Sequence, residues 1–397
     1  MHLLLWAEDS ESELRSELAQ SFTGGPEGSA ALSLDASSKP PPGGVAISWS
    51  SGLSVPLPRL VFARQLLPDA SPAQAESVRG WASRLFEAAA GVIPDDQPWS
   101  LHLEPQYGAR AAHRIGARAW HSTSRGWGGA GPEPERAKQP AVQPDAEAGR
   151  HRCRLIREAL IELLHKKRRH LLRRLRGEPA PWTAQNSLVQ LLLTAPNAGY
   201  ISVAVAPAPF EQRHLISPFP KGELPVAADK TAPSRAFAKL VEAELRLGRS
   251  IQSGEACVDL GAAPGSWTYV AASRGANVIA VDRSPLREDL MRNPQVDFRS
   301  GDAFRFQPSR PVDWLLCDVI AAPERTADLL LAWLRRRWCR HFVVTLKVGK
   351  GQVTGGERAG SEALADLRRD LPPLTRELFL TRLCANKREV CAFGSAR

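Results

Sequence analysis

The chain has 397 residues, enough for two or three domains with a sizeable core. Its 52 lysines and arginines outnumber 42 acidic residues, and the net charge of +10 favours a polyanionic partner such as nucleic acid. The six cysteines lack Cys-x-x-Cys spacing and no apolar run is long enough for a membrane span, which argues against a zinc site, a disulfide scaffold and a membrane protein. We expect a cytoplasmic monomer with buried, reduced thiols, no metal ion and no membrane partner.

The first 58 residues are predicted to form a small α+β unit. Residues 2–7 and 45–49 have the apolar character of strands, and residues 10–20 place Leu14 and Leu18 on one face of a helix. The unit is expected to end near Pro58.

A second unit is predicted over residues 59–210. The expected elements are a first segment at 60–65, helices at 74–90 and 150–176, and strands at 99–103, 187–194 and 200–206. Residues 108–149 are rich in Gly, Pro, Ala and Arg without periodicity, so we expect a disordered insertion there. Its tryptophans and arginines could stack on RNA bases, although an unconstrained loop is the simpler interpretation (Arg118, Trp120, Arg125 and Trp127).

The helix predicted at 150–176 carries a run of one charge sign. Basic residues interrupt its apolar spacing for one turn and continue to its end (Lys166, Lys167, Arg168, Arg169, Arg173, Arg174 and Arg176). Such a run is often only a solvated helix face, but one sign over several turns is equally consistent with contact to phosphates. The proline-rich residues 211–232 are predicted to be an extended linker.

Residues 233–397 alternate strands and helices in the pattern of a parallel, doubly wound sheet. Strands are predicted at 256–260, 277–282, 296–300, 314–319 and 342–348, with a helix at 324–336. The runs 377–381 and 389–393 have no helix between them and are expected to form an antiparallel pair at the sheet edge. The predicted fold class is therefore α/β, with a Rossmann-like C-terminal domain behind α+β N-terminal units.

The segment from Cys257 to Thr268 combines a strand, a glycine-containing turn and the start of a helix. Such a turn at the carboxyl end of a strand is where open α/β sheets bind ligands. Gly261 and Gly265 lie four residues apart behind Asp259, which is not the G-x-G-x-x-G spacing of a dinucleotide site. We interpret the turn as suited to a compact sulfonium amino acid rather than a pyrophosphate, with an ordinary strand–turn–helix junction as the alternative.

Acidic residues follow three successive predicted strands, as Asp282, Asp302 and Asp318. The carboxyl ends of parallel strands share one edge of the sheet, so we expect these side chains beside the glycine turn. Asp282 is placed to accept hydrogen bonds from ribose hydroxyls and Asp302 to accept the adenine amino group, although any one of them alone could be a helix N-cap.

Lys347 ends a buried, apolar strand, as Asp318 does. One interpretation is a lysine that snorkels to the surface. The other is a general base whose pKa is lowered by burial or by a second lysine.

Two segments resemble the FtsJ-like RNA 2′-O-methyltransferases. Residues 259–267 (Asp-Leu-Gly-Ala-Ala-Pro-Gly-Ser-Trp) resemble their cofactor turn, and residues 234–240 (Ser-Arg-Ala-Phe-Ala-Lys-Leu) resemble the S-R-x-x-x-K-L segment that precedes it. Lys239, Asp318, Lys347 and Glu389 then match the Lys-Asp-Lys-Glu tetrad of the group. Within the group the chain is most similar to the bacterial RlmM family, strongly from residue 217 onward and faintly before it. That family methylates a cytidine ribose in the peptidyl-transferase loop of 23S ribosomal RNA.

The resemblance implies a division of labour along the chain. Residues 59–210 would form a THUMP-like RNA-binding domain, and residues 233–397 the methyltransferase domain with ribosomal RNA as its partner. The donor would be S-adenosylmethionine, held by Ala236, Asp259, Gly261, Ala263, Pro264, Gly265, Ser266, Trp267, Asp282, Asp302 and Asp318. The chain departs from the family at Ser266, where a second glycine is usual, and at Ala236, where a serine contacts the donor.

The resemblance also assigns the catalytic roles. Lys347 would be the general base, and Lys239 would position the 2′-hydroxyl and keep Lys347 partly neutral by like-charge repulsion. Asp318 would hold the active lysine beside the methyl group, and Glu389 would orient one of the two lysines.

Other functions are open from the sequence. The same tetrad could methylate another RNA such as tRNA, and a protein of this fold could be a non-catalytic RNA-binding assembly factor, which the intact tetrad argues against. The glycine spacing argues against a nicotinamide dehydrogenase. A base methyltransferase with a cysteine nucleophile is disfavoured because the Cys317 side chain should point away from the site.

Overall fold

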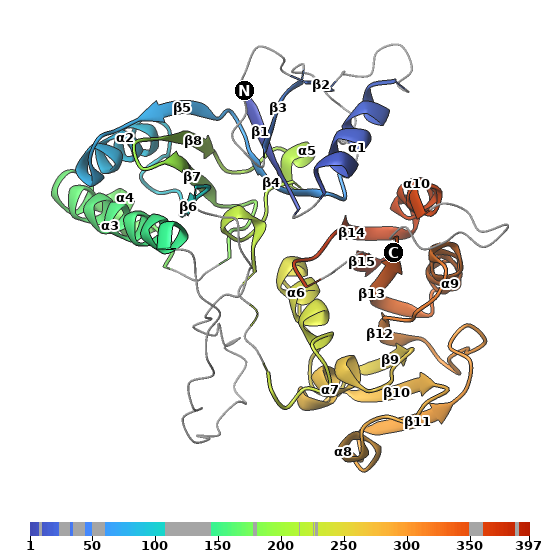
Figure 1. The fold of residues 1–397 in the computed structure, drawn as a ribbon. Coiled ribbons are helices and arrows are strands. Elements are labelled where there is room, and N and C mark those ends of the chain that lie inside the picture. The colour runs from blue at the N-terminus through green and yellow to red at the C-terminus, as the bar shows by residue number, and fades with distance from the viewer. Residues whose placement is uncertain are drawn as a thin grey trace. The chain divides into compact units, whose positions relative to one another are not determined.

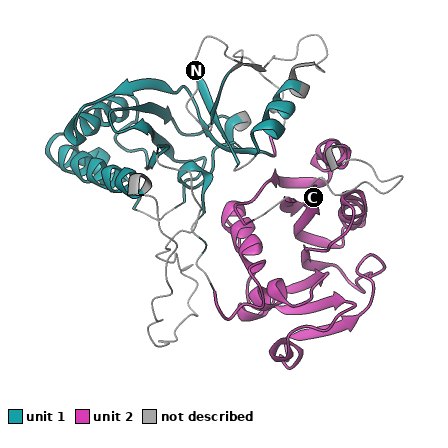
Figure 2. Ribbon diagram, in the orientation of Figure 1, with its two compact units in different colours: residues 1–58, 62–227 teal, residues 59–61, 228–397 magenta. Residues whose placement is uncertain are grey.

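The computed structural model describes residues 1–7, 10–23, 32–34, 44–49, 60–107, 144–177, 181–213, 215–224, 226, 229–348, 360–385 and 389–397. They belong to two compact units, unit 1 with residues 1–58 and 62–227, and unit 2 with residues 59–61 and 228–397 (Figure 2). The finer division of unit 1 into an N-terminal part and a THUMP-like domain stays a prediction.

The first sheet of unit 1 has the strand order β2-β3-β1-β4. Its elements are β1 (His2–Trp6), α1 (Glu11–Thr23), β2 (Leu32–Leu34), β3 (Gly44–Trp49) and β4 (Ala63–Leu67). Strand β4 pairs antiparallel with β1, with Leu66 opposite Leu4. The segment that we predicted to begin a second unit therefore completes the sheet of the first, because β4 supplies an apolar strand next to β1.

The second sheet of unit 1 has the order β5-β8-β7-β6. Its strands are β5 (Ser71–Gln74), β6 (Trp99–Pro105), β7 (Ser187–Ala195) and β8 (Ala198–Ala204), and its helices are α2 (Val78–Ala90), α3 (Pro144–Lys167), α4 (Arg169–Arg174) and α5 (Phe210–Arg213), with a 3₁₀ turn η1 (Pro220–Gly222). Trp81 and Leu85 of α2 and Leu160 of α3 lie in one core with Trp99 and Leu101 of β6. The helical spacing of these apolar residues thus buries α2 and α3 against the sheet.

Three predictions for unit 1 need correction. The predicted helix at 150–176 is two helices separated at Arg168, whose φ of −145° and ψ of 65° are not helical. Residues 144–149 of the predicted disordered insertion are helical, because α3 begins at Pro144, while residues 108–143 lie outside the described residues. The predicted linker is not simply extended, since it contains α5 and buries Leu215, Ile216, Phe219 and Leu224.

Unit 2 is built on a seven-stranded sheet with the order β11-β10-β9-β12-β13-β15-β14 (Figure 1). Its elements are α6 (Phe237–Leu247), β9 (Ala256–Leu260), α7 (Ser266–Ser273), β10 (Asn277–Asp282), α8 (Glu288–Met291), β11 (Val296–Ser300), β12 (Val312–Cys317), α9 (Pro323–Arg335), β13 (Cys339–Lys347), α10 (Gly360–Asp370), η2 (Pro372–Leu374), β14 (Thr375–Thr381) and β15 (Glu389–Ala396). The first five strands in this order are parallel. Strand β15 runs antiparallel to both β13 and β14, which confirms the predicted antiparallel pair at the edge.

The strand order of unit 2 reverses between β9 and β12, which are neighbours although β10 and β11 lie between them in the chain. In open α/β sheets, ligands bind outside the carboxyl ends of the strands at such a reversal. The glycine turn follows β9 and Asp318 follows β12, so both lie at this point.

All six cysteines are free thiols. Five are buried as predicted, but Cys384 is exposed, because it lies in the connection between β14 and β15 rather than in a strand. Among the described residues, no helix is long and apolar enough to cross a membrane.

Candidate active site

Four elements of unit 2 bring the tetrad together. Lys239 lies on α6, Asp318 follows β12, Lys347 is the last residue of β13, and Glu389 is the first residue of β15. The antiparallel register places Lys347 directly opposite Glu389. Residues that span 150 positions of the sequence therefore meet at one end of the sheet.

The tetrad is a closed network of two cations and two carboxylates. Asp318 lies between both lysines, with its Oδ2 3.0 Å from Lys239 Nζ and its Oδ1 3.0 Å from Lys347 Nζ. Glu389 also lies between the two lysines, with its carboxylate oxygens 2.5 Å from Lys239 Nζ and 2.7 Å from Lys347 Nζ. All four side chains are at most 24% exposed, so water screens these pairs far less than it screens surface pairs.

Electrostatics in the tetrad differ from the prediction. Burial acts to lower the pKa of Lys347, but the negative charges of Asp318 and Glu389 and their hydrogen bonds outweigh it and raise that pKa above the ordinary value. Burial acts to raise the pKa of Glu389, and its contacts with Lys239 and Lys347 lower it on balance. Our expectation of a partly neutral Lys347 is therefore wrong for this state, because each lysine contacts two carboxylates.

The glycines of the turn have a structural reason of their own. Gly261 and Gly265 have φ of 73° and 108°, a conformation that side chains disfavour. A Cβ atom would lie 3.0 Å from Val319 at Gly261 and 2.3 Å from Leu290 at Gly265. Close packing within the protein thus accounts for both glycines, and their contact with a ligand stays a prediction.

The segment before α6 is fastened to the turn by side-chain hydrogen bonds. Trp267 Nε1 donates to the carbonyl oxygen of Ala236 at 2.8 Å. The hydroxyl of Ser266 is 2.7 Å from that of Ser234, which in turn accepts the N–H of Ala236 at 3.2 Å. The hydroxymethyl group of Ser266 is 4% exposed, and the structure thus accommodates this departure from the family inside the protein. Sequence reasoning did not assign Ser234 this role, although it stands in the motif.

Asp282 and Asp302 retain acceptor capacity at the edge of the sheet. Asp282 accepts the N–H of Ala263 at 3.0 Å with one oxygen and the N–H of Ser284 at 2.9 Å with the other. A carboxylate can accept about four hydrogen bonds, so both oxygens can also accept ribose hydroxyls. Asp302 accepts from the Phe304 N–H at 3.0 Å and from Arg283 at 2.9 Å, and these two contacts lower its pKa. These residues fit a nucleoside donor.

Asp259 is buried beneath the turn and receives a hydrogen bond from the Thr268 hydroxyl at 2.7 Å. Burial raises its pKa to about 7, with smaller contributions from the charges of Asp318 and Asp282. Direct contact between Asp259 and a donor stays a prediction. Thr268 was not singled out as a site residue from the sequence, although it is the last residue of the segment from Cys257 that contains the turn.

Cys317 lies at the end of β12 beside Asp318. Burial raises the pKa of its thiol to about 12, which is contrary to what a cysteine nucleophile requires. In the described part of the chain, no group of three or more His, Cys, Asp or Glu side chains could hold a metal ion.

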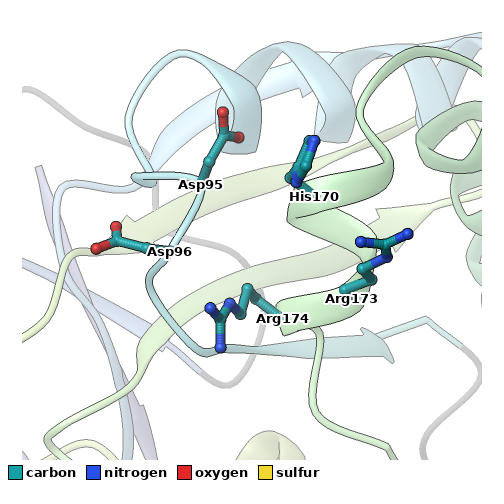
Figure 3. Close-up of a pocket in the computed structure, with 5 residues that line it drawn as sticks. All are labelled: Asp95, Asp96, His170, Arg173 and Arg174. Carbon is teal, nitrogen blue, oxygen red and sulfur yellow. The ribbon is translucent and has the colours of Figure 1, made fainter.

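Unit 1 has a second candidate surface, which we call the basic corner and define as residues 165–176 of α3, α4 and their flanks. Its lysines and arginines are exposed except for Arg168, which is half-buried and lies 2.6 Å from Asp95. Among the described residues, no other member of the corner is within ion-pair distance of a carboxylate. A cavity of about 370 Å³ lies here, with Asp95 and Asp96 on one side and His170, Arg173 and Arg174 of α4 on the other (Figure 3).

Comparison with known proteins supports the assignment of unit 2. The family model described as FtsJ-like methyltransferase matches residues 232–346. A ribosomal RNA large subunit methyltransferase M of Halorhodospira halophila is 35% identical over 208 residues, which cover 52% of this chain and 56% of that protein. Its namesake in Azoarcus is 39% identical over 138 residues, covering 33% of this chain and 38% of that protein. The chain thus spans less than two thirds of the length of either relative.

Among solved structures, the fibrillarin pre-rRNA processing protein of Methanococcus jannaschii covers 39% of this chain and 74% of its own, at 18% identity and a TM-score of 0.31. A likeness this low carries no argument. The family model, in contrast, spans residues 234–240, the glycine turn and Asp318, whereas Lys347 and Glu389 lie beyond its end. The family model and the relatives together confirm the resemblance to the RlmM family, and residues 232–346 match the family of FtsJ-like methyltransferases.

Proposed function

We propose that the protein transfers the methyl group of S-adenosylmethionine to a ribose 2′-hydroxyl of ribosomal RNA, at a cytidine in the peptidyl-transferase loop of the large subunit. The observation that carries the proposal is the tetrad, a pair of lysines held by a pair of carboxylates at the strand-order reversal. The curated relatives are named as ribosomal RNA large subunit methyltransferases, which supports the choice of substrate.

The residues at the end of the sheet can perform the reaction as follows. S-adenosylmethionine, when bound, supplies a methyl group on a positively charged sulfur. Asp282 would bind the ribose of the donor and Asp302 its adenine. Lys239 would hold the target hydroxyl, and Lys347 Nζ would take its proton while the oxygen bonds to the methyl carbon and the bond from that carbon to sulfur breaks, which leaves a neutral thioether. Asp318 and Glu389 fix both lysines, so that most of the gain comes from alignment.

Lys347 must lose its own proton before it can act as a base. Asp318 and Glu389 raise its pKa in the free protein, so the ammonium form dominates at neutral pH. Positive charge brought next to Asp318 would compete for this carboxylate and lower the pKa of Lys347. The positive charge of the bound donor would thus favour the neutral, basic form of Lys347.

We propose that the basic corner of unit 1 contributes RNA binding. Exposed guanidinium groups without carboxylate partners suit contact with phosphates, and the release of counterions makes such binding favourable and sensitive to salt. Arg173 and Arg174 line one side of the cavity of Figure 3, and Asp95 and Asp96, which would repel a phosphate, line the other.

The test is transfer of labelled methyl from S-adenosylmethionine to unmodified bacterial large-subunit RNA, with Lys347→Ala beside the wild type and the product digested to nucleosides. We expect 2′-O-methylcytidine from the wild type and at least a hundredfold less from the variant. Label on another nucleoside, or on tRNA only, would keep the enzyme class and change the substrate. Donor binding without transfer to any RNA would contradict the proposal in favour of a non-catalytic RNA-binding protein.

A further inference from the structure

Helix α6 carries a second buried charge on the same side as Lys239. Glu242 follows Lys239 by three positions and precedes Arg246 by four, and these spacings place all three on one face of the helix. The Glu242 side chain is 0% exposed and lies 2.9 Å from Arg246, which is itself 8% exposed. A buried carboxylate of this kind needs several hydrogen bonds to offset the loss of water.

The remaining partners of Glu242 come from the other end of unit 2. One carboxylate oxygen accepts the N–H of Cys384 at 2.9 Å, and the other accepts the N–H of Ala385 at 3.1 Å. These amides belong to the connection between β14 and β15, and Glu389 begins β15 four residues later. Glu242 thus fastens α6, which carries Lys239, to the chain segment that leads into Glu389.

The attachment of α6 to the β14–β15 connection matters because Glu389 lies at the very start of β15. Glu389 pairs with Lys347 at the end of the β13–β15 ladder, where the described pairing stops. A terminal residue of a ladder is held less firmly than an interior one. The contacts of Lys239 with Glu389 at 2.5 Å and with Asp318 at 3.0 Å therefore require α6 and the start of β15 to keep a fixed separation.

We propose that Glu242 is a positioning residue of the methyl transfer: it locks α6 to the β14–β15 connection, so that Lys239 stays in contact with Glu389 and Asp318. Its catalytic consequence rests on the proposed function, whereas the lock itself does not. Among the described hydrogen bonds, the Glu242 carboxylate contacts Arg246 and the two amides and none of the tetrad side chains.

The same helix offers a matched control. Glu244 is also buried, at 1% exposed, and its carboxylate accepts the Ile251 N–H at 2.8 Å and pairs with Arg274. Its partners are again an arginine and a backbone amide, but they lie after the C-terminal end of α6 and at the end of α7, and not in the chain leading to Glu389. Any general cost of neutralising a buried glutamate should appear in both variants.

The experiment compares Glu242→Gln with Glu244→Gln in the full chain. Amide exchange by mass spectrometry should rise at least tenfold over residues 382–385 in Glu242→Gln, and over residues 249–256 instead in Glu244→Gln. Single-turnover methyl transfer at saturating donor and RNA should fall at least thirtyfold in Glu242→Gln and less than threefold in Glu244→Gln. The affinity for the donor should stay within twofold in both.

A pH profile adds a readout that simple loss of stability would not move. Lys239 and Lys347 lower the pKa of Glu389, so displacement of Lys239 should move the acidic limb of the transfer rate to higher pH in Glu242→Gln only.

If that variant does not fold, Glu242→Asp keeps the charge but has a shorter side chain, and the same changes in exchange and rate are expected at smaller size. Equal losses of transfer rate in the two variants, or unchanged exchange over residues 382–385, would overturn the inference. If the wild type transfers no methyl group to any RNA, the catalytic role of Glu242 fails together with the proposed function. The exchange data then test on their own whether Glu242 holds α6 to the β14–β15 connection.

Discussion

The two units use their basic side chains in opposite ways. In unit 2, Lys239 and Lys347 are largely buried, and each contacts two carboxylates at 2.5 to 3.0 Å. In unit 1, the basic corner is exposed, and Arg168 is its one described member paired with a carboxylate. Buried, paired charges have a fixed direction and strong mutual fields, whereas exposed charges act over a distance and are screened by salt. The contrast supports the proposal that unit 2 directs charge at one reacting atom and that unit 1 attracts an extended polyanion.

The strongest way to break this contrast is to remove the carboxylate that both lysines share. Asp318→Asn keeps the size of the side chain but removes its negative charge from the 3.0 Å contacts with Lys239 and Lys347. We expect the rate of methyl transfer to fall by roughly 10²–10⁴-fold, in the range of general acid–base effects. Rapid-quench kinetics at saturating RNA would measure it.

The matched variant is Asp282→Asn, which lies on the donor side of the same edge. It should weaken donor binding more than it slows transfer at saturating donor. Similar effects of the two variants on both quantities would mean that the acidic residues do not have separate roles.

The raised pKa of Lys347 predicts an unusual pH dependence. Above its pKa the lysine is neutral and able to accept a proton, so kcat/KM, which reports the free enzyme, should rise about tenfold per pH unit from pH ~6.5 to ~9.5 without a plateau. Initial rates on a short RNA over this range are the measurement. A plateau near neutral pH would show that Lys347 is not the base, or that its pKa in the free enzyme is lowered.

Asp259 shows how a buried carboxyl group without a neighbouring cation affects stability. Its described side-chain hydrogen bond comes from the Thr268 hydroxyl and not from a lysine or arginine. The pKa of Asp259 is raised to about 7 in the folded protein. The folded state is therefore most stable below the ordinary pKa of the carboxyl group. It loses stability as the pH rises toward 7, because the unfolded chain releases this proton at a lower pH than the folded protein does. Between pH 5 and pH 8 the wild type should lose about 2–3 kcal/mol of unfolding free energy relative to Asp259→Asn, at ~1.4 kcal/mol per pKa unit. Urea denaturation at both values would show it, and a difference independent of pH would indicate that Asp259 stays ionised throughout.

Unit 1 provides the next smaller effect. Arg173→Gln with Arg174→Gln should weaken RNA binding about tenfold near 100 mM salt and reduce the slope of log affinity against log salt by about two, while leaving the rate at saturating RNA unchanged. Filter binding across salt concentrations measures both. The control is Arg79→Gln with Arg84→Gln, which removes the same charge from exposed positions on α2. Equal losses in the two pairs would mean that net charge, and not the basic corner, attracts the RNA.

The parts of the fold that the sequence predicted best are those fixed by local patterns. The strands at 256–260, 277–282 and 296–300 match the structure at both ends. The first two are the short apolar runs that the interior of a parallel sheet requires, whereas the third lies at the sheet edge and is delimited by the turns on either side of it. The tetrad residues are brought together as predicted, since strand ends in a parallel sheet meet at one edge.

The parts that sequence reasoning missed depend on partners far away in the chain. Strand β4 joins β1 across some sixty residues, and nothing in its own residues distinguishes that sheet from the next. The direction of the Lys347 pKa follows from carboxylates 29 positions before and 42 positions after it. The sequence around a lysine does not show whether burial, which lowers its pKa, or two neighbouring carboxylates, which raise it, has the larger effect. The attachment of Cys384 and Ala385 to Glu242 is equally nonlocal, at separations of 142 and 143 residues.

The smallest expected effect concerns Ser266, where unit 2 departs from the family. Because its hydroxyl lies 2.7 Å from the Ser234 hydroxyl and the side chain is buried, Ser266→Gly should cost about 1 kcal/mol of stability, the usual contribution of one hydrogen bond. Ser234→Ala should cost a similar amount. Donor affinity measured by calorimetry should change less than threefold in Ser266→Gly, since the hydroxymethyl group packs inside the protein. An increase of tenfold or more in donor affinity would show instead that the Ser266 side chain occupies space that the donor needs. The serine at this position would then restrict donor binding, and its buried hydrogen bond would hold it in the restricting position.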